Sequence, residues 1–161
     1  MFLLEICKAF EQGKLDYAVI GGYAVALHGA VRGTIDIDII INIEKKSFKK
    51  AERILKSLGL TSKIPVKATD LFKNRIDFMQ NKNLVAWSFY DADNPLKLVD
   101  IIIVEDLRDY QVEKIRVNQH TIAVLTKEDL IKLKEKGERR QDREDVRALK
   151  RLMKIEKISS N

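Results

Sequence analysis

The segment 34–43 constrains the fold more than any other part of the sequence, because isoleucine and aspartate alternate within it. The alternating residues are Ile35, Asp36, Ile37, Asp38 and Ile39. Successive side chains of a β-strand point to opposite faces, and β-branched isoleucine suits a packed sheet. The pattern therefore predicts a strand whose isoleucines fill an apolar face and whose two aspartates share the other face.

The remaining hydrophobic pattern predicts helices and strands in a mixed order. We expect helices at 2–12, 23–28, 47–58, from 126 and from 140, and strands at 17–20, 84–90, 96–104, 113–117 and 121–125. Ser47 is the expected N-cap of the third helix, and Gly59 is expected to end it. Residues 60–83 give no clear pattern. We expect residues 157–161 to form a frayed tail. This order predicts an α/β or α+β fold with a mixed sheet flanked by helices. We expect one domain over 1–161, with a core at about 15–125 and a helical part at about 126–156.

The charge balance favours polyanionic partners without choosing among them. The chain has 30 Lys and Arg against 24 Asp and Glu, a formal net charge of +6. Such an excess attracts nucleotides and RNA alike, and it also promotes solubility. Cys7 is the only cysteine, so no internal disulfide can form, and its apolar neighbours predict a buried thiol. Because no apolar run reaches membrane-spanning length, we expect no membrane partner and a cytoplasmic location.

Asp36 and Asp38 carry the clearest chemical signal in the sequence. Two carboxylates on one face of an apolar strand repel each other and lose hydration, and a divalent cation between them relieves both penalties. Mg²⁺ prefers oxygen ligands and is commonly held by carboxylates together with substrate phosphates. Asp100 is the best candidate for a third ligand because it is also a lone acid in an apolar strand. The competing interpretation is the solvent-exposed face of an edge strand.

Gly21 and Gly22 strengthen the metal-site interpretation, because they separate a predicted strand from a predicted helix. Without side chains there, backbone N–H groups can approach a phosphate closely. Arg32 and Thr34 place a cation and a hydroxyl group just before the acids. We therefore expect the glycines, Arg32 and Thr34 to bind a nucleotide.

This combination resembles the nucleotidyltransferase superfamily of the DNA polymerase β type, in which two glycines after a strand precede Asp-x-Asp between apolar residues. Here Gly21-Gly22 is followed by thirteen residues and then Asp36-Ile37-Asp38. The stretches 21–29 and 32–38 look like the small bacterial and archaeal branch that includes AbiEii-type toxins. The C-terminal stretches 130–134 and 139–146 are similar to the helical ending of that branch.

The resemblance implies a mixed sheet, two Mg²⁺ ions and transfer of a nucleoside monophosphate from an NTP such as ATP to an acceptor hydroxyl. Asp36, Asp38 and Asp100 would be the catalytic metal ligands, and Gly21 and Gly22 would cradle the phosphates. Lys134, Arg139 and Arg32 would supply positive charge to the triphosphate, although solvated surface positions compete for each. The acceptor could be a small molecule, a tRNA 3′ end or a protein, and an antitoxin-like partner is consistent with the toxin resemblance.

Other polar and aromatic residues favour structural roles. We expect Asp142 and Asp145 to pair with Arg139 or Lys150 on a helix, and His28 to be packed or capping rather than a base. Trp87 and Tyr90 could stack a base, but aromatic residues of an apolar strand usually belong to the core. Two other functions remain open, a catalytically silent nucleotide-binding or interaction module on the same fold and a basic RNA-binding or nuclease-like protein.

Overall fold

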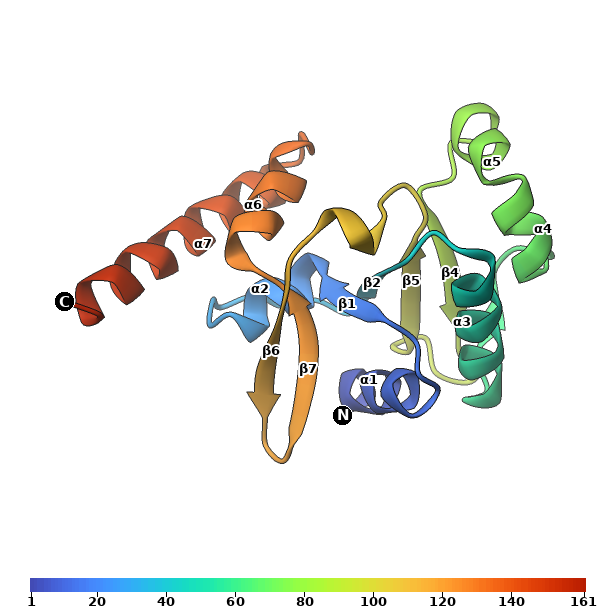
Figure 1. Ribbon diagram of the computed structural model, residues 1–161, viewed down its shortest axis with the longest axis horizontal. Helices are drawn as coiled ribbons and strands as arrows, with labels where there is room; N and C mark the ends of the chain where they lie inside the picture. Colours follow the sequence, from blue (N-terminus) through green and yellow to red (C-terminus); the bar gives the residue numbers. More distant parts are fainter.

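The computed structural model describes residues 1–161 and contains a seven-stranded mixed sheet (Figure 1). The strands are β1 (Tyr17–Ile20), β2 (Ile37–Ile41), β3 (Thr61–Ser62), β4 (Ala86–Tyr90), β5 (Leu98–Ile102), β6 (Val112–Val117) and β7 (His120–Leu125). Their spatial order is β3-β4-β5-β2-β1-β7-β6. β2 is parallel to β5 and β1 is parallel to β7, whereas the other neighbouring pairs are antiparallel. The predicted mixed sheet flanked by helices is confirmed.

Seven α-helices and one 3₁₀ helix surround the sheet. They are α1 (Phe2–Gln12), α2 (Gly21–Leu27), α3 (Lys45–Ser57), α4 (Ala68–Lys73), α5 (Arg75–Asn81), the 3₁₀ helix η1 (Leu107–Asp109), α6 (Lys127–Glu135) and α7 (Arg140–Ser159). Thr126 caps α6, since its Oγ1 accepts a hydrogen bond from the Asp129 N–H. The frayed tail was predicted too early, because α7 remains helical to Ser159.

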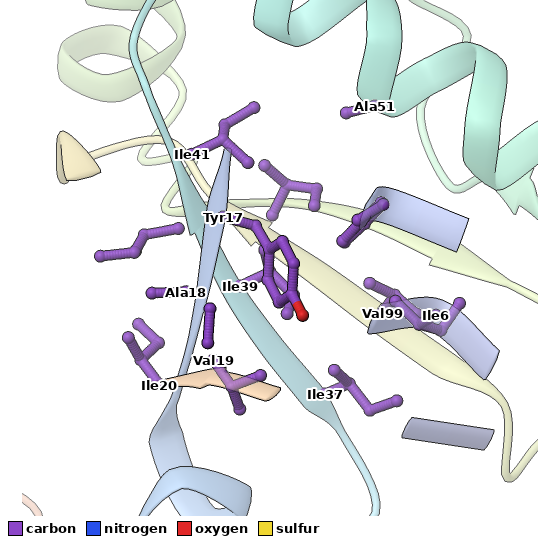
Figure 2. Close-up of a cluster of buried hydrophobic side chains, with 14 of the residues drawn as sticks. Ile6, Tyr17, Ala18, Val19, Ile20, Ile37, Ile39, Ile41, Ala51 and Val99 are labelled. Carbon is purple, nitrogen blue, oxygen red and sulfur yellow. The ribbon is translucent and has the colours of Figure 1, made fainter. Parts of the chain in front are cut away.

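One face of the sheet packs against α1 and α3. Figure 2 shows Ile6 of α1 and Ala51 of α3 in a buried cluster with Ile37 and Ile39 of β2. Full burial of each isoleucine side chain contributes about 1.5–3 kcal/mol relative to exposure. The prediction that Trp87 belongs to the core is confirmed, because it is fully buried.

The opposite face carries the polar side chains of β2 and β5. Because side chains alternate along a strand, Asp38 points away from the face on which Ile37 and Ile39 lie. α2 contacts β1 and β2 and also packs against α6 and α7, so these helices cover part of this second face. Figure 1 shows α6 and α7 together at one end of the molecule, away from α3.

The strand around the two aspartates is shorter than the predicted range 34–43. β2 begins at Ile37, and Asp36 lies one residue before it. β1 ends at Ile20, which pairs with Asp38, and the chain then turns into α2, so residues before Ile37 have no β1 neighbour. Ile35 was expected to fill the apolar face, but it is 53% exposed.

The helix boundaries also differ from the predicted ones. α3 begins two residues early, after Glu44, and Ser47 is a buried residue inside its first turn rather than the N-cap. The predicted stop is confirmed, since Gly59 follows the helix with φ +83°. Residues 60–83, which gave no clear pattern, contain β3, α4 and α5, which are too short for a periodic signal.

No helix combines the length and the apolar character that crossing a membrane requires. Cys7 is buried on α1, as predicted. Burial raises the pKa of its thiol to about 11, which keeps the group protonated and weakly reactive.

Candidate active site

Two of the expected acids lie side by side on the sheet. Asp38 of β2 and Asp100 of β5 are partners in the parallel register, so their side chains leave the same face. Both side chains are half-buried. The structure therefore brings together two carboxylates that are 62 positions apart in the sequence.

Asp36 lies outside the strand and does not complete a cluster with this pair. It is exposed and lies in the extended segment that leads into β2. No group of three or more His, Cys, Asp or Glu side chains is arranged to hold a metal ion in this structure. Asp36 would therefore have to turn toward Asp38 and Asp100 to complete a three-carboxylate site, which its exposure permits.

The pKa of Asp38 is raised by burial and by the two neighbouring acids. Burial, followed by the charges of Asp100 and Asp36, raises this pKa to about 7. The positive charges of Lys134 and Arg139 lower it by smaller amounts. The negative charge of Asp38 is thus only partly compensated by Lys134 and Arg139, which is the situation that a bound cation corrects.

Gly21 brings the backbone directly against Asp38. Its φ is +67°, and a Cβ atom added there would lie 2.0 Å from Asp38 Oδ2. A Cβ atom on Gly22 would lie 2.8 Å from Thr34 Cβ. The glycine pair is therefore required sterically, because Gly21 lies against Asp38 and Gly22 lies against Thr34.

Ser88 holds Asp100 in place and was not identified from the sequence. It is the antiparallel partner of Asp100 on β4, and its hydroxyl donates a short hydrogen bond to Asp100 Oδ1. The other oxygen of Asp100 stays available for a ligand. The serine could not be recognised in advance, because its role follows from the β4–β5 register and no local motif marks it.

A cavity of about 430 Å³ lies over these residues. Asp38, Asp100 and Gly21 form its base, and Val85 and Ile102 provide apolar walls. The loop and helix ends of α6 and α7 close another side; their lining residues are Lys134, Gly137, Glu138, Arg139 and Asp142. The cavity therefore combines apolar walls with a few converging charged groups, as small-molecule sites commonly do.

Lys134 reaches the cavity from within a buried ion-pair network. The residue is only 8% exposed. Its Nζ lies 2.7 Å from Asp145 Oδ2 and 3.8 Å from Asp142 Oδ1. The contact with Asp145 is electrostatic rather than an aligned hydrogen bond, because Asp145 Oδ2 accepts none. Much of the charge of Lys134 is thus already compensated by α7.

Arg139 is the more accessible cation at the cavity. Its Nε donates to Asp142 Oδ2 and its Nη2 to Asp142 Oδ1, both at 3.0 Å. This bidentate pair confirms the structural pairing predicted between Arg139 and Asp142, and it lowers the pKa of that carboxyl group. Lys150 pairs with Glu135 instead of the α7 aspartates. The Arg139 side chain remains mostly exposed at the rim.

Arg32 ties the loop before β2 to α7. Its Nε lies 3.1 Å from Asp145 Oδ1, which also accepts a hydrogen bond from Gln141 Nε2 at 2.9 Å. Arg32 therefore braces the segment that carries Thr34 and Asp36, and its guanidinium is already engaged by a carboxylate. The network joins α6, α7 and the loop around the acids.

His28 has the packed position that the sequence predicted. Its Nε2 donates to the Leu125 carbonyl oxygen at 2.7 Å, and Nδ1 lies 3.3 Å from Glu113 Oε1. The ring is almost completely buried. It does not line the cavity over the acids.

A family model described as "Nucleotidyl transferase of unknown function (DUF2204)" matches residues 2–161. The chain belongs to this nucleotidyltransferase family. No curated protein is significantly similar to it in sequence. The family match does not test the resemblance to the AbiEii-type branch, which stays a prediction.

Solved structures share the fold of this nucleotidyltransferase. The lincosamide antibiotic adenylyltransferase LnuA, bound to lincomycin, has a TM-score of 0.66 at 17% identity, over 94% of this chain and 96% of that one. ANT(2")-Ia, in complex with adenylyl-2"-tobramycin, has a TM-score of 0.61 at 14% identity, over 98% and 91%. An antigenic nucleotidyltransferase-like protein from Paracoccidioides brasiliensis has a TM-score of 0.56 at 15% identity, over 94% and 73%. At these identities the likeness establishes the fold alone.

Proposed function

We propose that this nucleotidyltransferase is Mg²⁺-dependent and transfers a nucleoside monophosphate from an NTP to an acceptor hydroxyl group. One observation carries the proposal: Asp38 and Asp100 are register partners on parallel strands and form the base of a cavity beside Gly21. Crowded carboxylates are costly for folding. A scaffold without a cationic ligand has no use for them, which supports an active site.

The donor set fits magnesium. Asp36, Asp38 and Asp100 offer only carboxylate oxygens, the ligands that Mg²⁺ prefers. The pKa of Asp38 is raised first by burial and then by the charges of Asp100 and Asp36, and a bound cation would offset both effects. When bound, Mg²⁺ would neutralise phosphate charge and lower the pKa of the acceptor hydroxyl group. We propose two such ions, as in the superfamily that the motif resembles.

The backbone beside the acids would hold the triphosphate. Gly21 and Gly22 would offer backbone N–H groups where α2 begins, and Thr34 adds a hydroxyl group next to Gly22. Arg139 is the residue that would neutralise the outer phosphates, because its side chain is exposed at the cavity rim. Lys134 and Arg32 would contribute positive potential from their ion pairs with Asp145 rather than direct contact.

The transfer itself requires mainly positioning. The acceptor oxygen forms a bond to the α-phosphorus while the bond to pyrophosphate breaks. Asp100 would receive the hydroxyl proton at Oδ2, because the Ser88 hydroxyl occupies Oδ1.

The acceptor belongs to one of three classes: a small molecule, a tRNA 3′ end or a protein. LnuA and ANT(2")-Ia are described as bound to an antibiotic and an adenylylated antibiotic, which makes small hydroxylated molecules the first class to assay. The toxin resemblance adds an antitoxin-like partner to the proposal. Co-purification with the product of a neighbouring reading frame would test that part separately.

The central experiment measures ATP, GTP, CTP and UTP binding by calorimetry with and without Mg²⁺, followed by release of labelled pyrophosphate. We expect metal-dependent binding that the double variant Asp36→Asn with Asp38→Asn abolishes. The matched control removes two exposed aspartates outside the cavity, Asp70→Asn with Asp93→Asn, and should bind as the wild type does. Unchanged metal-dependent binding in the first variant would refute the site assignment.

The catalytically silent module is the second candidate. The observation that favours it is the absence of a preformed three-carboxylate cluster, with Asp36 exposed outside β2. A silent module would bind NTP and release no pyrophosphate with any acceptor class. An active enzyme would release pyrophosphate in proportion to the acceptor modified, which mass spectrometry can count.

A further inference from the structure

Helix α3 carries most of the excess positive charge of the chain. Six of the 30 Lys and Arg residues lie between Lys45 and Ser57, but only one of the 24 Asp and Glu residues does. The other 148 residues hold 24 basic and 23 acidic side chains, which is within one charge of neutrality. The formal net charge of +6 is therefore largely a property of one helix.

These charges face solvent because the apolar side of α3 is used by the core. Phe48 and Ala51 are fully buried against the sheet. Lys45, Lys49 and Arg53 recur every four residues and are exposed, so they form a stripe with one charge per helical turn, roughly 6 Å apart. We call these three residues the α3 stripe.

The stripe is not neutralised by neighbouring acids. Lys46 Nζ lies 3.4 Å from Glu44 Oε2, and Lys56 Nζ lies 3.6 Å from Glu52 Oε2. The exposed cations of this region that form no ion pair in the structure are Lys45, Lys49, Arg53 and Lys67. Their charge is available to a partner.

A groove of about 520 Å³ runs between α3 and the start of α4. Five of its eight lining residues are basic: Lys46, Lys49, Lys50, Arg53 and Lys67. The other three are Glu52, Ala68 and Thr69. Glu52 Oε2 accepts a hydrogen bond from the Ala68 N–H at 3.1 Å, which joins the two walls of the groove. This hydrogen bond fixes the position of α3 relative to the start of α4, so the basic groove has a defined shape.

We propose that the α3 stripe and this groove bind the phosphate backbone of RNA. Lysine is depleted at protein–protein interfaces but is a common point-charge partner of phosphate. Helices that lie on membranes need large apolar residues at the lipid boundary, whereas Phe48 of α3 is fully buried. The composition therefore favours a polyphosphate chain over an acidic protein or a lipid surface.

Two polar groups in the groove favour RNA over DNA. Glu52 supplies a carboxylate and Thr69 a hydroxyl group among the cations. A carboxylate repels phosphates but accepts a hydrogen bond from a ribose 2′-hydroxyl group, which DNA lacks. Because α3 packs on the face opposite Asp38 and Asp100, RNA bound there leaves the nucleotide cavity free. The inference goes beyond the proposed function and does not depend on it.

Fluorescence anisotropy with a labelled single-stranded RNA, titrated at several salt concentrations, tests the surface. The stripe variant is Lys45→Gln, Lys49→Gln and Arg53→Gln. Each lost phosphate contact lowers the log–log salt slope by about 0.7 for single strands, so we expect the slope to fall by about 2 and low-salt affinity to fall at least about tenfold. Circular dichroism and the melting temperature establish that the variant is folded.

A matched control removes the same number of charges from α7, by Arg147→Gln, Arg151→Gln and Lys154→Gln. These residues are also exposed, so net charge falls equally, and we expect less than about a threefold loss of affinity. An equal loss in both triple variants would overturn the proposal, because net charge alone would then explain binding. DNA of the same sequence, or phosphatidylserine vesicles, binding as tightly as RNA would overturn it too.

Nucleotide binding separates this inference from the proposed function. The stripe variant should bind Mg²⁺ and ATP as the wild type does. The double variant Asp36→Asn with Asp38→Asn should bind RNA normally. Failure of ATP binding in the wild type, with stripe-dependent RNA binding intact, would refute only the enzyme proposal. The reverse result would refute only the RNA surface.

Discussion

Replacing Asp38 with asparagine should make the metal-free protein more stable while it removes the proposed activity. The pKa of Asp38 is raised from 3.8 to about 7, so the folded protein holds the proton more tightly than the unfolded chain does. One pKa unit corresponds to about 1.4 kcal/mol, and the difference corresponds to about 4 kcal/mol. Asparagine has nearly the same shape and no charge, so the variant avoids this penalty.

The loss of stability caused by ionised Asp38 develops over a defined range of pH. Below pH 3.8 the carboxyl group is protonated in both states and contributes nothing. As pH rises from 3.8 to about 7 the unfolded chain releases the proton first, and the free energy of unfolding of the wild type falls. Above that range the full penalty remains. The stability difference between Asp38→Asn and the wild type should therefore grow across this window and then level off.

Urea unfolding in EDTA at several pH values measures the effect. We expect Asp38→Asn to exceed the wild type by about 4 kcal/mol at about pH 8, near 10 °C in melting temperature for a domain of this size. Asp93→Asn, an exposed change in the turn after β4, should have no effect. A gain that is absent at about pH 8, or equally large at about pH 4, would refute the reasoning. Mg²⁺ with ATP should then stabilise the wild type and leave Asp38→Asn unchanged.

Three further predictions follow from the same site and core. Gly21→Ala places a Cβ atom against Asp38 at positive φ, so it should lower the free energy of unfolding by about 1–3 kcal/mol and abolish Mg²⁺-dependent ATP binding. Normal ATP binding in calorimetry would contradict the close approach of Gly21 to Asp38. Ser88→Ala removes the hydrogen bond to Asp100, so the free energy of unfolding measured in urea should fall by only about 1 kcal/mol. The variant should nevertheless lower kcat more than it changes KM, and Ser88→Thr should partly restore the rate. Cys7 is buried with a raised pKa, so a thiol reagent at about neutral pH should label it only after denaturant unfolds the chain; rapid labelling of the native protein would contradict that burial.

Much of the candidate site could be predicted because it is encoded locally. The period of two in 35–39 is a property of neighbouring residues, and it identified Asp36 and Asp38 before any contact was known. Gly21 and Gly22 were informative for the same reason, since a missing side chain is visible in the sequence. Asp100 was a lone acid in an apolar strand, and its placement beside Asp38 matches that prediction.

Local patterns failed where a distant partner decides the outcome. Residues 34–36 have the composition of a strand, yet β1 is too short to pair with them, so Asp36 lies outside β2. Lys134 was a lysine in a helix of alternating charges, and only the packing of α7 shows that Asp145 holds it. The same holds for Arg32, which reaches Asp145 across 113 positions.

The sequence by itself determined which face of the clearly patterned helices and strands is apolar, where glycines allow a turn, and which residues can supply carboxylates. The tertiary structure alone decided which of these groups meet: Asp38 with Asp100, Asp100 with Ser88, and Lys134 with Asp145. The physical reason is that periodicity and turn preference depend on neighbours along the chain. Strand register and helix packing depend instead on the burial of apolar surface between segments that are far apart in the sequence.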